Sequence, residues 1–371
     1  MVDETWLKTQ LAFPLARTNM EGVYTTPPLP GDLDLKTASD ATLLQHGLLL
    51  QRPRQGASPA AVAAWNTVSE RGLQTIAPIL APLPDTLPRI RRLPGPGPRT
   101  PQATSTNWCG CVLEGAGNWR SVTGTLSLPY LSVPPQGLAG NPAAALSAWV
   151  GLDGWGTQQT DLFQAIMNFN LNTANNPPSA FFNTPTWQWW VPVPNDPSAS
   201  QYFGGGTVTN APAMNSGDLV QIYCGFVQAL NGSNWGAVYF LFLNDLETVV
   251  VPEPVSFKGR HRTAQIPILM NFFFPGPPTV PGQGGCVEWI MENETVTNNL
   301  PGGIMPVFSA SPGSITPVTF TQALAYGQAE GVTGDPVNGF TVLWANSSGQ
   351  VSNVASVALA SQTVSITYTG P

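Results

Sequence analysis

Alternating and wholly apolar runs of residues, separated by Gly, Pro and Asn, make up most of the chain from residue 105 onward. Successive side chains of a strand point to opposite faces, so alternation of this kind predicts β-structure. In this region apolar residues do not recur at the helical period of 3.6 residues. About a dozen strands at this spacing predict an all-β fold, either a two-sheet antiparallel sandwich or a barrel. The predicted strands span 107–113, 121–128, 146–152, 159–168, 186–192, 218–228, 235–244, 247–252, 286–292, 317–323, 339–345 and 362–369.

The first 82 residues follow a different pattern. Residues 1–35 are irregular. Residues 37–82 contain two amphipathic segments, one starting near Asp40 and one at Ser58-Pro59, where proline suits the first turn of a helix. We therefore expect two helices in the N-terminal part. Their apolar positions are Leu43, Leu44 and Leu48 in the first helix, and Val62, Trp65, Val68 and Leu73 in the second.

A segment rich in proline and glycine, from Pro82 to Pro101, joins these two parts and contains four arginines. Proline favours extended, exposed backbone, so we expect a linker that proteases can cut. The sequence thus predicts an N-terminal extension at 1–104, with its linker at 83–104. One β-sandwich domain follows at 105–371.

Composition supports a folded chain. Charged residues form only 9% of the 371 residues, while Gly and Pro number 37 and 38. So much Gly and Pro occurs both in disordered chains and in turn-rich β proteins. The hydrophobic content of 42% and the 12 tryptophans favour the folded alternative, because disordered chains carry little aromatic surface.

Charge is distributed unevenly along the chain. Residues 1–100 contain ten of the 14 Lys and Arg and eight of the 21 Asp and Glu, a net charge of +2. Residues 101–371 contain the other four and 13, a net charge of −9. This contrast predicts an extension that docks by charge and is later removed, although an ordinary extension would look the same. The domain lacks a basic stripe, so we expect no nucleic-acid partner, and its few titratable groups tolerate acid.

Hydropathy gives no sign of a membrane span, because apolar runs of about 18 residues are all interrupted. The N-terminus has acidic residues at Asp3 and Glu4 and lacks the apolar core of a secretory signal. We therefore expect no membrane partner, and the residues themselves do not predict export.

The four cysteines are Cys109, Cys111, Cys224 and Cys286. Cys109 and Cys111 are two residues apart in a predicted strand, so their side chains share a face. They lack the matching His and Cys motifs of a zinc site. We expect buried free thiols or one disulfide between strands, and we expect no metal or other cofactor.

Seven short motifs occur in an order that resembles one peptidase family, the eqolisins or glutamic peptidases. The similarity extends over about residues 105–370, and each motif alone is weak. The motifs are Asn107-Trp108, Val122-Thr-Gly-Thr-Leu-Ser-Leu-Pro129, Trp149-Val-Gly-Leu-Asp-Gly154, Gln159-Thr-x-Leu-x-Gln164, Trp187-x-x-Trp190-x-Pro192, Ser216-Gly-Asp218 and Glu288-Trp-Ile-x-Glu292.

The resemblance implies a concanavalin-like β-sandwich in which one sheet forms a substrate groove. It implies a metal-independent endopeptidase that acts at acid pH and resists pepstatin. The family's catalytic glutamine falls on Gln164 and its catalytic glutamate on Glu292. Family members are secreted and are made with a removable N-terminal segment, so the resemblance also implies export and a role for residues 1–104 as an inhibitor.

The chemistry of the two residues agrees with this assignment. Glu288 and Glu292 share a strand face but lie about 13 Å apart, which is too far for two carboxyls to share a proton. A glutamine amide both donates and accepts hydrogen bonds. Gln164 could therefore position a water and stabilise the oxyanion, while Glu292 acts as general base and then acid, or acts first as acid.

We expect five further residues to border the substrate: Trp149, Asp153, Trp187, Trp189 and Glu288. Trp149 and Trp187 could instead be core residues, and Asp153 could instead fix its Gly-flanked turn. The resemblance places a family glutamate at Trp189 and a family aspartate at Pro185. This chain therefore lacks two carboxyls, which predicts a more apolar groove that favours bulky hydrophobic side chains.

Two alternative functions remain open on the sequence. One is a catalytically silent, lectin-like sandwich that binds carbohydrate through tryptophans. The other is a glycoside hydrolase, which needs two carboxyls roughly 5–10 Å apart. Glu292 and Glu294 could approach that separation, since they share a strand face about 7 Å apart. For the leading hypothesis, the partners are polypeptide substrates, and we expect a monomer.

Overall fold

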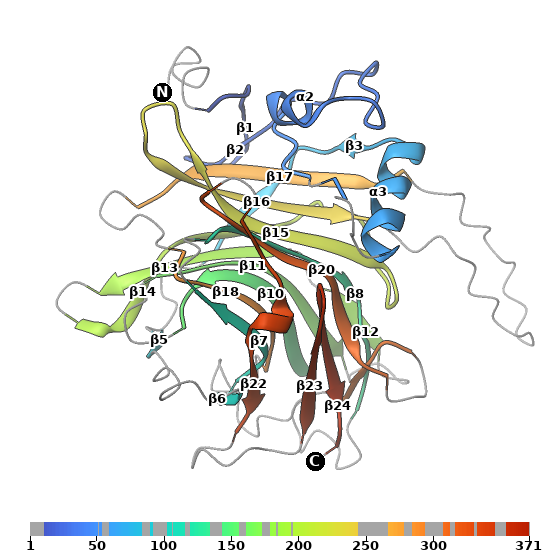
Figure 1. Cartoon of the computed structure of the whole chain (residues 1–371), viewed down its shortest axis with the longest axis vertical. Coiled ribbons are helices and arrows are strands. Elements are labelled where there is room, and N and C mark those ends of the chain that lie inside the picture. The colour runs from blue at the N-terminus through green and yellow to red at the C-terminus, as the bar shows by residue number, and fades with distance from the viewer. Residues whose placement is uncertain are drawn as a thin grey trace, which may run out of the picture.

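The computed structural model describes residues 11–50, 52–53, 59–83, 90–91, 102–105, 107–115, 119–133, 143–155, 161–172, 179–182, 185–193, 196–243, 266–277, 284–293, 307–311, 316–329, 332–345 and 354–370. Two large, mainly antiparallel sheets face each other across a shared core (Figure 1). The all-β sandwich predicted from the alternating runs is confirmed.

Sheet A has the strand order β1-β2-β17-β16-β15-β8-β20-β24-β23, with β3 beside β17 and β21 beside β20. Its strands are β1 (Ala16–Arg17), β2 (Tyr24–Thr25), β3 (Gln74–Thr75), β8 (Trp119–Ser127), β15 (Leu219–Gln228), β16 (Asn234–Phe242), β17 (Ile268–Pro275), β20 (Val318–Gly327), β21 (Thr333–Gly334), β23 (Ala355–Ala360) and β24 (Thr363–Tyr368). All pairs are antiparallel except β3 with β17.

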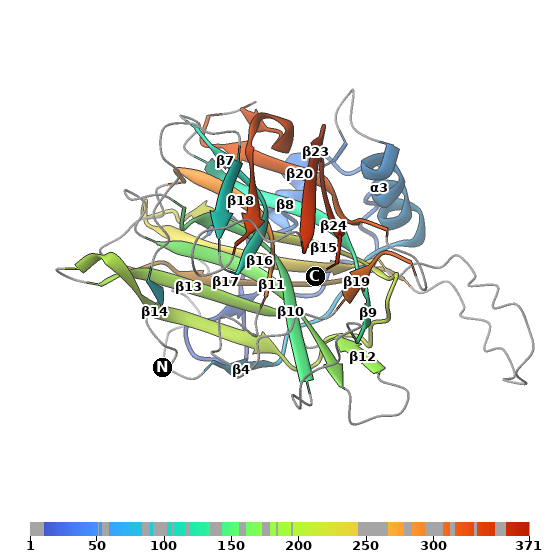
Figure 2. The same ribbon diagram turned by 90° about the horizontal axis from the view of Figure 1, so that it is seen from below.

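Sheet B has the order β4-β14-β13-β11-β10-β18-β7-β22-β6, with β12 beside β11 and β5 beside β14. Figure 2 shows its central strands β14, β13, β11, β10, β18 and β7. Its strands are β4 (Leu80–Pro82), β5 (Ile90–Arg91), β6 (Gln102–Ser105), β7 (Trp108–Glu114), β10 (Ala143–Asp153), β11 (Leu162–Asn172), β12 (Ser179–Phe182), β13 (Thr186–Val193), β14 (Asp196–Val208), β18 (Cys286–Glu292) and β22 (Phe340–Trp344). A small separate sheet pairs β9 (Tyr130–Ser132) with β19 (Val307–Ser309), and η1 (Pro336–Asn338) is a short 3-10 turn.

The hydrophobic core lies between the two sheets and consists of side chains from the inner face of each. Val150 and Phe163 from sheet B and Phe240 and Phe272 from sheet A are fully buried there. Side chains of a strand alternate between faces, so the neighbours of these residues in sequence point away from the core. We call the face of sheet B that points away from sheet A the site face.

The N-terminal part forms a third layer on the outer face of sheet A (Figure 1). It contains α2 (Asp40–Gln45) and α3 (Pro59–Arg71). A second hydrophobic cluster joins this layer to β15, β16 and β17, and it includes Phe13 and Leu43 from the layer and Trp235 from the sheet. The ring centroids of Phe13 and Phe273 are 4.9 Å apart. The N-terminal layer therefore completes a core of its own.

Asn271 of β17 gives this interface a polar anchor. Its side chain is buried and its Oδ1 accepts hydrogen bonds from the hydroxyls of Thr25 (2.9 Å) and Thr26 (3.1 Å). Its Nδ2 donates to the Thr26 hydroxyl over 2.9 Å. An unpaired amide in this position would be costly, so the hydrogen bonds specify one docking geometry.

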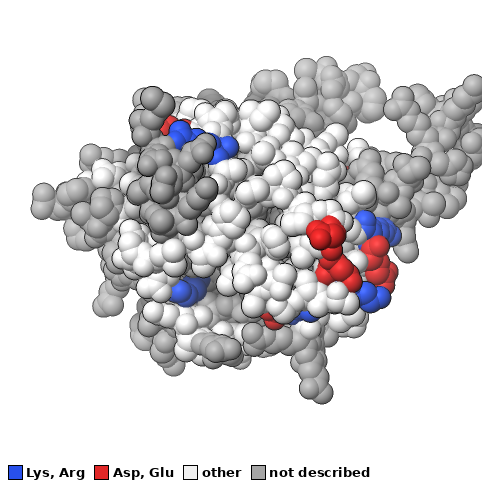
Figure 3. All heavy atoms as spheres, turned by 90° about the horizontal axis from the view of Figure 1, so that it is seen from above, with Lys and Arg blue, Asp and Glu red and all other residues white. Residues whose placement is uncertain are grey.

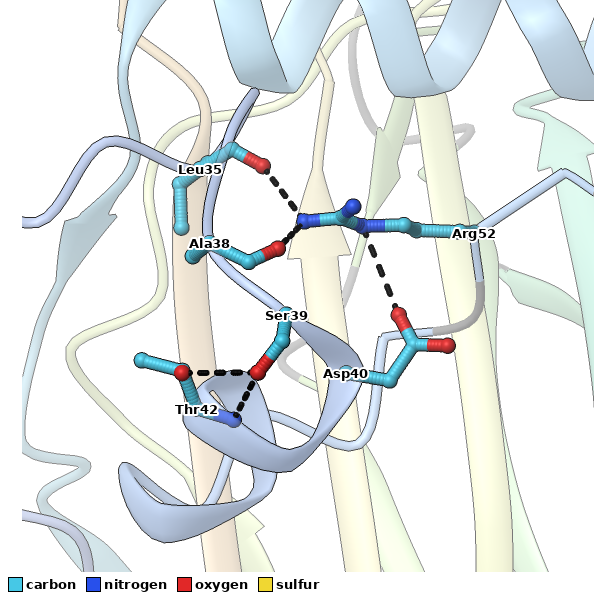
Figure 4. Close-up of polar contacts among 6 residues, drawn as sticks. All are labelled: Leu35, Ala38, Ser39, Asp40, Thr42 and Arg52. Atoms are coloured by element: carbon cyan, nitrogen blue, oxygen red, sulfur yellow. Dashed lines mark hydrogen bonds and ion pairs between the residues drawn. The ribbon is translucent and has the colours of Figure 1, made fainter.

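Arg52 holds the N-terminal layer together internally (Figure 4). Its guanidinium donates to the carbonyls of Leu35 and Ala38 and lies 3.4 Å from the Asp40 carboxylate. The same group lies over the Trp65 ring of α3, 5.1 Å from its centroid. Arg52 thus links the start of α2, which Ser39 caps, to α3.

The predicted helices and most predicted strands are present, with some differences in extent. Three long strands were not predicted: β14, β17 and β23. Residues 247–252, predicted as a strand, lie outside the described residues. Segments assigned to the linker form β5 and β6, which pair with β14 and β22. The predicted domain boundary at 104/105 therefore falls inside β6.

Charged groups are sparse on the described surface. Figure 3 looks onto the side of the molecule that carries the N-terminal layer, where a few Lys, Arg, Asp and Glu side chains stand among uncharged ones. Arg52 and Asp40 make the one ion pair found among the described residues. No helix among the described residues is long and apolar enough to cross a membrane.

Candidate active site

One row of residues crosses the middle of sheet B at Gly151. In the register of the sheet, Gly151 of β10 lies opposite Gln164 of β11 on one side and opposite Glu288 of β18 on the other. Gln188 of β13 lies opposite Gln164. Residues that are paired in this way share a face, so all four belong to the site face.

The amide of Gln164 makes a hydrogen bond within this row. Its Nε2 donates to Oε1 of Gln188 over 2.9 Å, and the indole N–H of Trp190 donates to the same oxygen over 3.1 Å. Oε1 of Gln164 is buried and accepts no hydrogen bond from the described residues. The Gln164 side chain is 4% exposed. The structure thus leaves an acceptor available on a nearly buried amide.

Glu292 lies on the same face, nearer the other end of β10, opposite Ser147. Its Oε1 accepts from Asn107 Nδ2 over 2.8 Å, and its Oε2 accepts from Trp149 Nε1 over 3.0 Å. Both partners are donors, so the contacts suit a carboxylate that is ionised. Glu292 is 7% exposed.

Trp149 connects the row of Glu292 with the row of Gln164. Ser147 and Gly151 are four residues apart on β10, an offset of about 13 Å along the strand. The indole N–H of Trp149 bonds Glu292, while the benzo edge of the ring lies over Gly151: a Cβ there would be 2.8 Å from the ring. Trp149 therefore spans the space between the two rows, and Gly151 is the residue that leaves room for it.

Glu288 is sealed in the sheet. It is fully buried, and a Cβ on Gly151 would be 3.2 Å from its Oε2. Burial raises the pKa of Glu288 well above its ordinary value, and the nearby carboxyls of Asp153 and Glu292 raise it further. The Cys286 thiol donates to its Oε1 over 3.7 Å. Glu288 is thus a neutral carboxylic acid in acid solution and has no direct contact with solvent.

Asp153 has a structural role, so the expectation that it borders the substrate is wrong. Its carboxylate is fully buried and accepts from the backbone N–H groups of Gly284 (2.9 Å) and Gly285 (2.7 Å). Its backbone has φ = 63°, a left-handed conformation that Asp tolerates better than most residues. Asp153 therefore ends β10 and fixes the segment that leads into β18.

Trp187 and Trp189 point into the sandwich core, so the prediction that they line the groove is wrong. Trp187 stacks on Phe274 with centroids 4.0 Å apart, and Trp189 stacks on Phe163 at 4.8 Å. The register puts Gln188 on the site face between them. Trp189 cannot make the groove more apolar, because its side chain does not reach the site face. The backbone carbonyl of Pro185 accepts from Val208 N–H at the start of β13.

Aromatic side chains surround the two polar groups on the site face. Trp108 meets Trp149 edge-on at 5.0 Å, and Trp190 meets Tyr202 edge-on at 5.6 Å. Trp149 itself is fully buried among them. It contributes one hydrogen-bond donor to the site, and its ring is a packing element.

Gln188, Trp190, Asn107 and Gly151 were not among the site residues predicted from the sequence. Asn107, Gly151 and Trp190 belong to the motifs of the resemblance, and this was the available signal for them. Gln188 gave none, because a lone Gln between tryptophans reveals neither its face nor its partner.

The cysteines are free and buried, so the thiol alternative holds and the disulfide does not form. Burial raises the pKa of all four thiols. Among the described residues, no group of three His, Cys, Asp or Glu side chains could hold a metal ion.

Residues 106–221 match the Peptidase A4 family. The matched segment contains Gln164, Trp149 and Gln188 and ends before β18, which carries Glu292. The match covers part of the region that resembles the eqolisins and agrees with that resemblance.

Comparison with solved structures gives aspergilloglutamic peptidase from Aspergillus niger, at 18% sequence identity and a TM-score of 0.34. The alignment covers 61% of this chain and 99% of that one. The sequence has no match among curated proteins.

Proposed function

We propose that the protein is an acid endopeptidase in which Gln164 and Glu292 act on the peptide bond. The observation that supports this best is that one face of sheet B carries both a carboxylate that can take a proton and an amide that can donate a hydrogen bond. Glu292 accepts hydrogen bonds from two donors, which favour the ionised form that can take a proton. Gln164 keeps a second amide hydrogen and an Oε1 that accepts no hydrogen bond from the described residues. Gln164 also lies inside the segment that matches the Peptidase A4 family.

In the proposed reaction, Glu292 takes a proton from a water whose oxygen attacks the carbonyl carbon of the substrate. The Gln164 amide donates a hydrogen bond to the carbonyl oxygen as it becomes an oxyanion. Glu292 then returns the proton to the amine nitrogen, and the C–N bond breaks. The reaction yields one carboxylic acid and one amine and consumes one water. No pair of aspartates takes part, so we expect pepstatin not to inhibit it.

Glu292 is preferred to Glu288 as the reacting carboxyl because of access. Glu288 lies in register with Gln164, which favours it, but it is fully buried beside Trp149. A carboxyl without solvent access cannot exchange its proton with an attacking water. Glu292 retains an exposed edge.

The placement of the N-terminal layer bears on the proposed precursor. Within residues 11–50, β1 and β2 extend the edge of sheet A, Val23 packs between the sheets, and most other buried apolar side chains pack on the outer face of sheet A, on the far side of the sandwich from the site face. These residues could not inhibit by covering Gln164 or Glu292. We propose instead that the layer stabilises the domain, and that export follows from the likeness to secreted peptidases.

Cleavage of an unfolded protein at pH 3–4, with pepstatin present, tests the proposal. Gln164→Ala should lower the rate about 10²–10³-fold, as loss of an oxyanion donor does. Glu292→Gln, which keeps the shape but cannot take a proton, should lower it at least as much. Gln228→Ala and Glu114→Ala, both exposed strand positions, are matched controls and should stay active.

Each other outcome has a definite reading. Loss of activity in Glu288→Gln but not in Glu292→Gln would transfer the role to Glu288. No cleavage by the intact protein, with binding of oligosaccharides to the aromatic side chains around Trp108 and Trp190, would replace the peptidase with the lectin-like alternative.

A further inference from the structure

We propose that Gln188, itself oriented by Trp190, is a positioning residue that fixes which way the Gln164 amide faces. This inference rests on the proposed catalytic role of Gln164. It concerns a residue that contacts the catalytic amide from the neighbouring strand.

The argument begins at Trp190, because an indole N–H can only donate. It donates to Gln188 over 3.1 Å, so the Gln188 atom that it meets must be the carbonyl oxygen. The same oxygen lies 2.9 Å from Gln164, so the Gln164 atom that it meets must be the NH₂ group. The indole N–H of Trp190 thus determines which atom of each amide is the oxygen and which is the nitrogen.

A flipped Gln164 amide would place two carbonyl oxygens against each other. That arrangement has no hydrogen bond and is repulsive, so the flip is disfavoured while Trp190 holds Gln188. Trp190 is 3% exposed and packs edge-on against Tyr202, which restricts its own rotation. The packed Trp190 indole therefore fixes the Gln188 amide, and Gln188 in turn fixes the amide of Gln164.

The consequence for the reaction is preorganisation. With Nε2 next to Gln188, one amide hydrogen remains for the oxyanion, and Oε1 is left on the other side. A freely rotating amide would spend part of its time presenting an acceptor where the reaction needs a donor. Preorganised donors act because they need no rearrangement when charge develops.

Glutamine and tryptophan do not titrate, so this arrangement is the same over the whole acid range. A carboxyl in the place of Gln188 would accept the same two hydrogen bonds. Gln188→Glu is therefore the conservative substitution at this position, and Gln188→Ala or Gln188→Leu is the disruptive one.

The test is a double-mutant cycle on the full chain with a quenched fluorogenic peptide. Gln188→Ala should lower kcat about tenfold and leave KM within about twofold, the loss expected for one hydrogen bond. Trp190→Phe should change kcat in the same direction by a smaller factor. Gln188→Glu should restore kcat to near the unaltered value, because it still accepts from both donors.

The decisive comparison is in the Gln164→Ala background. If Gln188 acts through Gln164, adding Gln188→Ala to Gln164→Ala should leave the residual rate unchanged. A residue with a general structural role would instead lower it again by the same factor. Gln221→Ala is the matched control, because it breaks a Gln–Gln hydrogen bond of 2.9 Å in sheet A and should leave kcat unchanged.

The two proposals fail in distinguishable ways. Full activity in Gln164→Ala would overturn the proposed function and this inference with it. An inactive Gln164→Ala beside a fully active Gln188→Ala, or additive losses in the cycle, would overturn the positioning role alone. Thermal unfolding of each variant checks that a low rate does not come from unfolded protein.

Discussion

The indole of Trp149 donates its one hydrogen bond to Oε2 of Glu292, over 3.0 Å. Through this contact Trp149, which is fully buried on the site face, orients the carboxyl that we propose takes part in the reaction. The relationship is testable because phenylalanine keeps most of the ring and loses the donor.

Trp149→Phe should lower kcat about 10-fold or more, since a hydrogen bond to a charged group contributes about 1.5–3 kcal/mol. Steady-state kinetics at acid pH measure the change. Trp235→Phe, a buried tryptophan on the outer face of sheet A, is the control for loss of ring volume. Equal kcat values in the two variants would contradict a specific role for the Trp149 donor.

Gly151→Ala should destabilise the protein by about 1–3 kcal/mol, the usual effect of overpacking. The new Cβ would be 2.8 Å from the Trp149 ring and 3.2 Å from Glu288 Oε2, so the ring must move. Activity should fall as well, because the moving ring carries the donor to Glu292. Thermal melts and kinetics test both effects. Gly115→Ala, whose Cβ would meet one ring atom of Trp119 at 3.7 Å and no nearer atom of the described residues, should change neither.

The protein should be most stable in acid and lose stability as pH rises. Burial raises the pKa of Glu288 well above its ordinary 4.5, so the folded state favours the protonated form. The stabilisation is complete below the unfolded pKa and is lost as pH rises toward the folded pKa. Melting temperatures from pH 3 to 8 measure this, and Glu288→Gln should flatten the curve. An equally steep curve in Glu288→Gln would mean that other groups cause the loss.

All four cysteines should be unreactive in the native protein. Each thiol is fully buried, and burial raises its pKa, so little thiolate forms. Titration with a thiol reagent at pH 8 should detect none in native buffer and four in denaturant. Two or fewer thiols in denaturant would show that a disulfide forms after all.

The N-terminal layer should stay bound after the chain is cut. A protease site inserted between residues 92 and 101 would allow one cleavage between layer and domain. The hydrophobic cluster and the Asn271 hydrogen bonds should keep both pieces together in gel filtration until denaturant is added. Phe13→Ala should weaken this association, because Phe13 packs on Phe273. Elution of the N-terminal piece alone, with a rise in activity, would restore its role as a removable inhibitor.

Alternation in the sequence was sufficient to predict the sandwich and most strands of its centre. It missed β17, because Asn271 interrupts the apolar run Ile268–Pro275 and its hydrogen-bond partners lie far away in the N-terminal layer. It also missed β14, in which Gly204, Gly205 and Gly206 have no side chains that could alternate. The failure at β17 comes from tertiary packing that a local pattern does not contain.

At the site, sequence predicted residues but not their faces. In Thr186–Val193 nearly every side chain is large and apolar. Both alternating sets of side chains could therefore face the core, and the sequence does not indicate which one does. The structure puts Trp187 and Trp189 inside and Gln188 outside. Asp153 was ambiguous for a different reason: its partners, Gly284 and Gly285, are about 130 residues away in the chain.

The pairing between the first and last parts of the chain has a consequence for biosynthesis. Thr25 bonds Asn271 across 246 positions, and Gln102–Ser105 pairs with Thr341–Trp344. A ribosome delivers the N-terminal layer long before the strand that it covers, so the layer must wait with its apolar residues uncovered. Folding dominated by such distant contacts is slow, and the waiting chain is prone to aggregate. We expect this protein to depend on chaperones during synthesis and to refold poorly from denaturant.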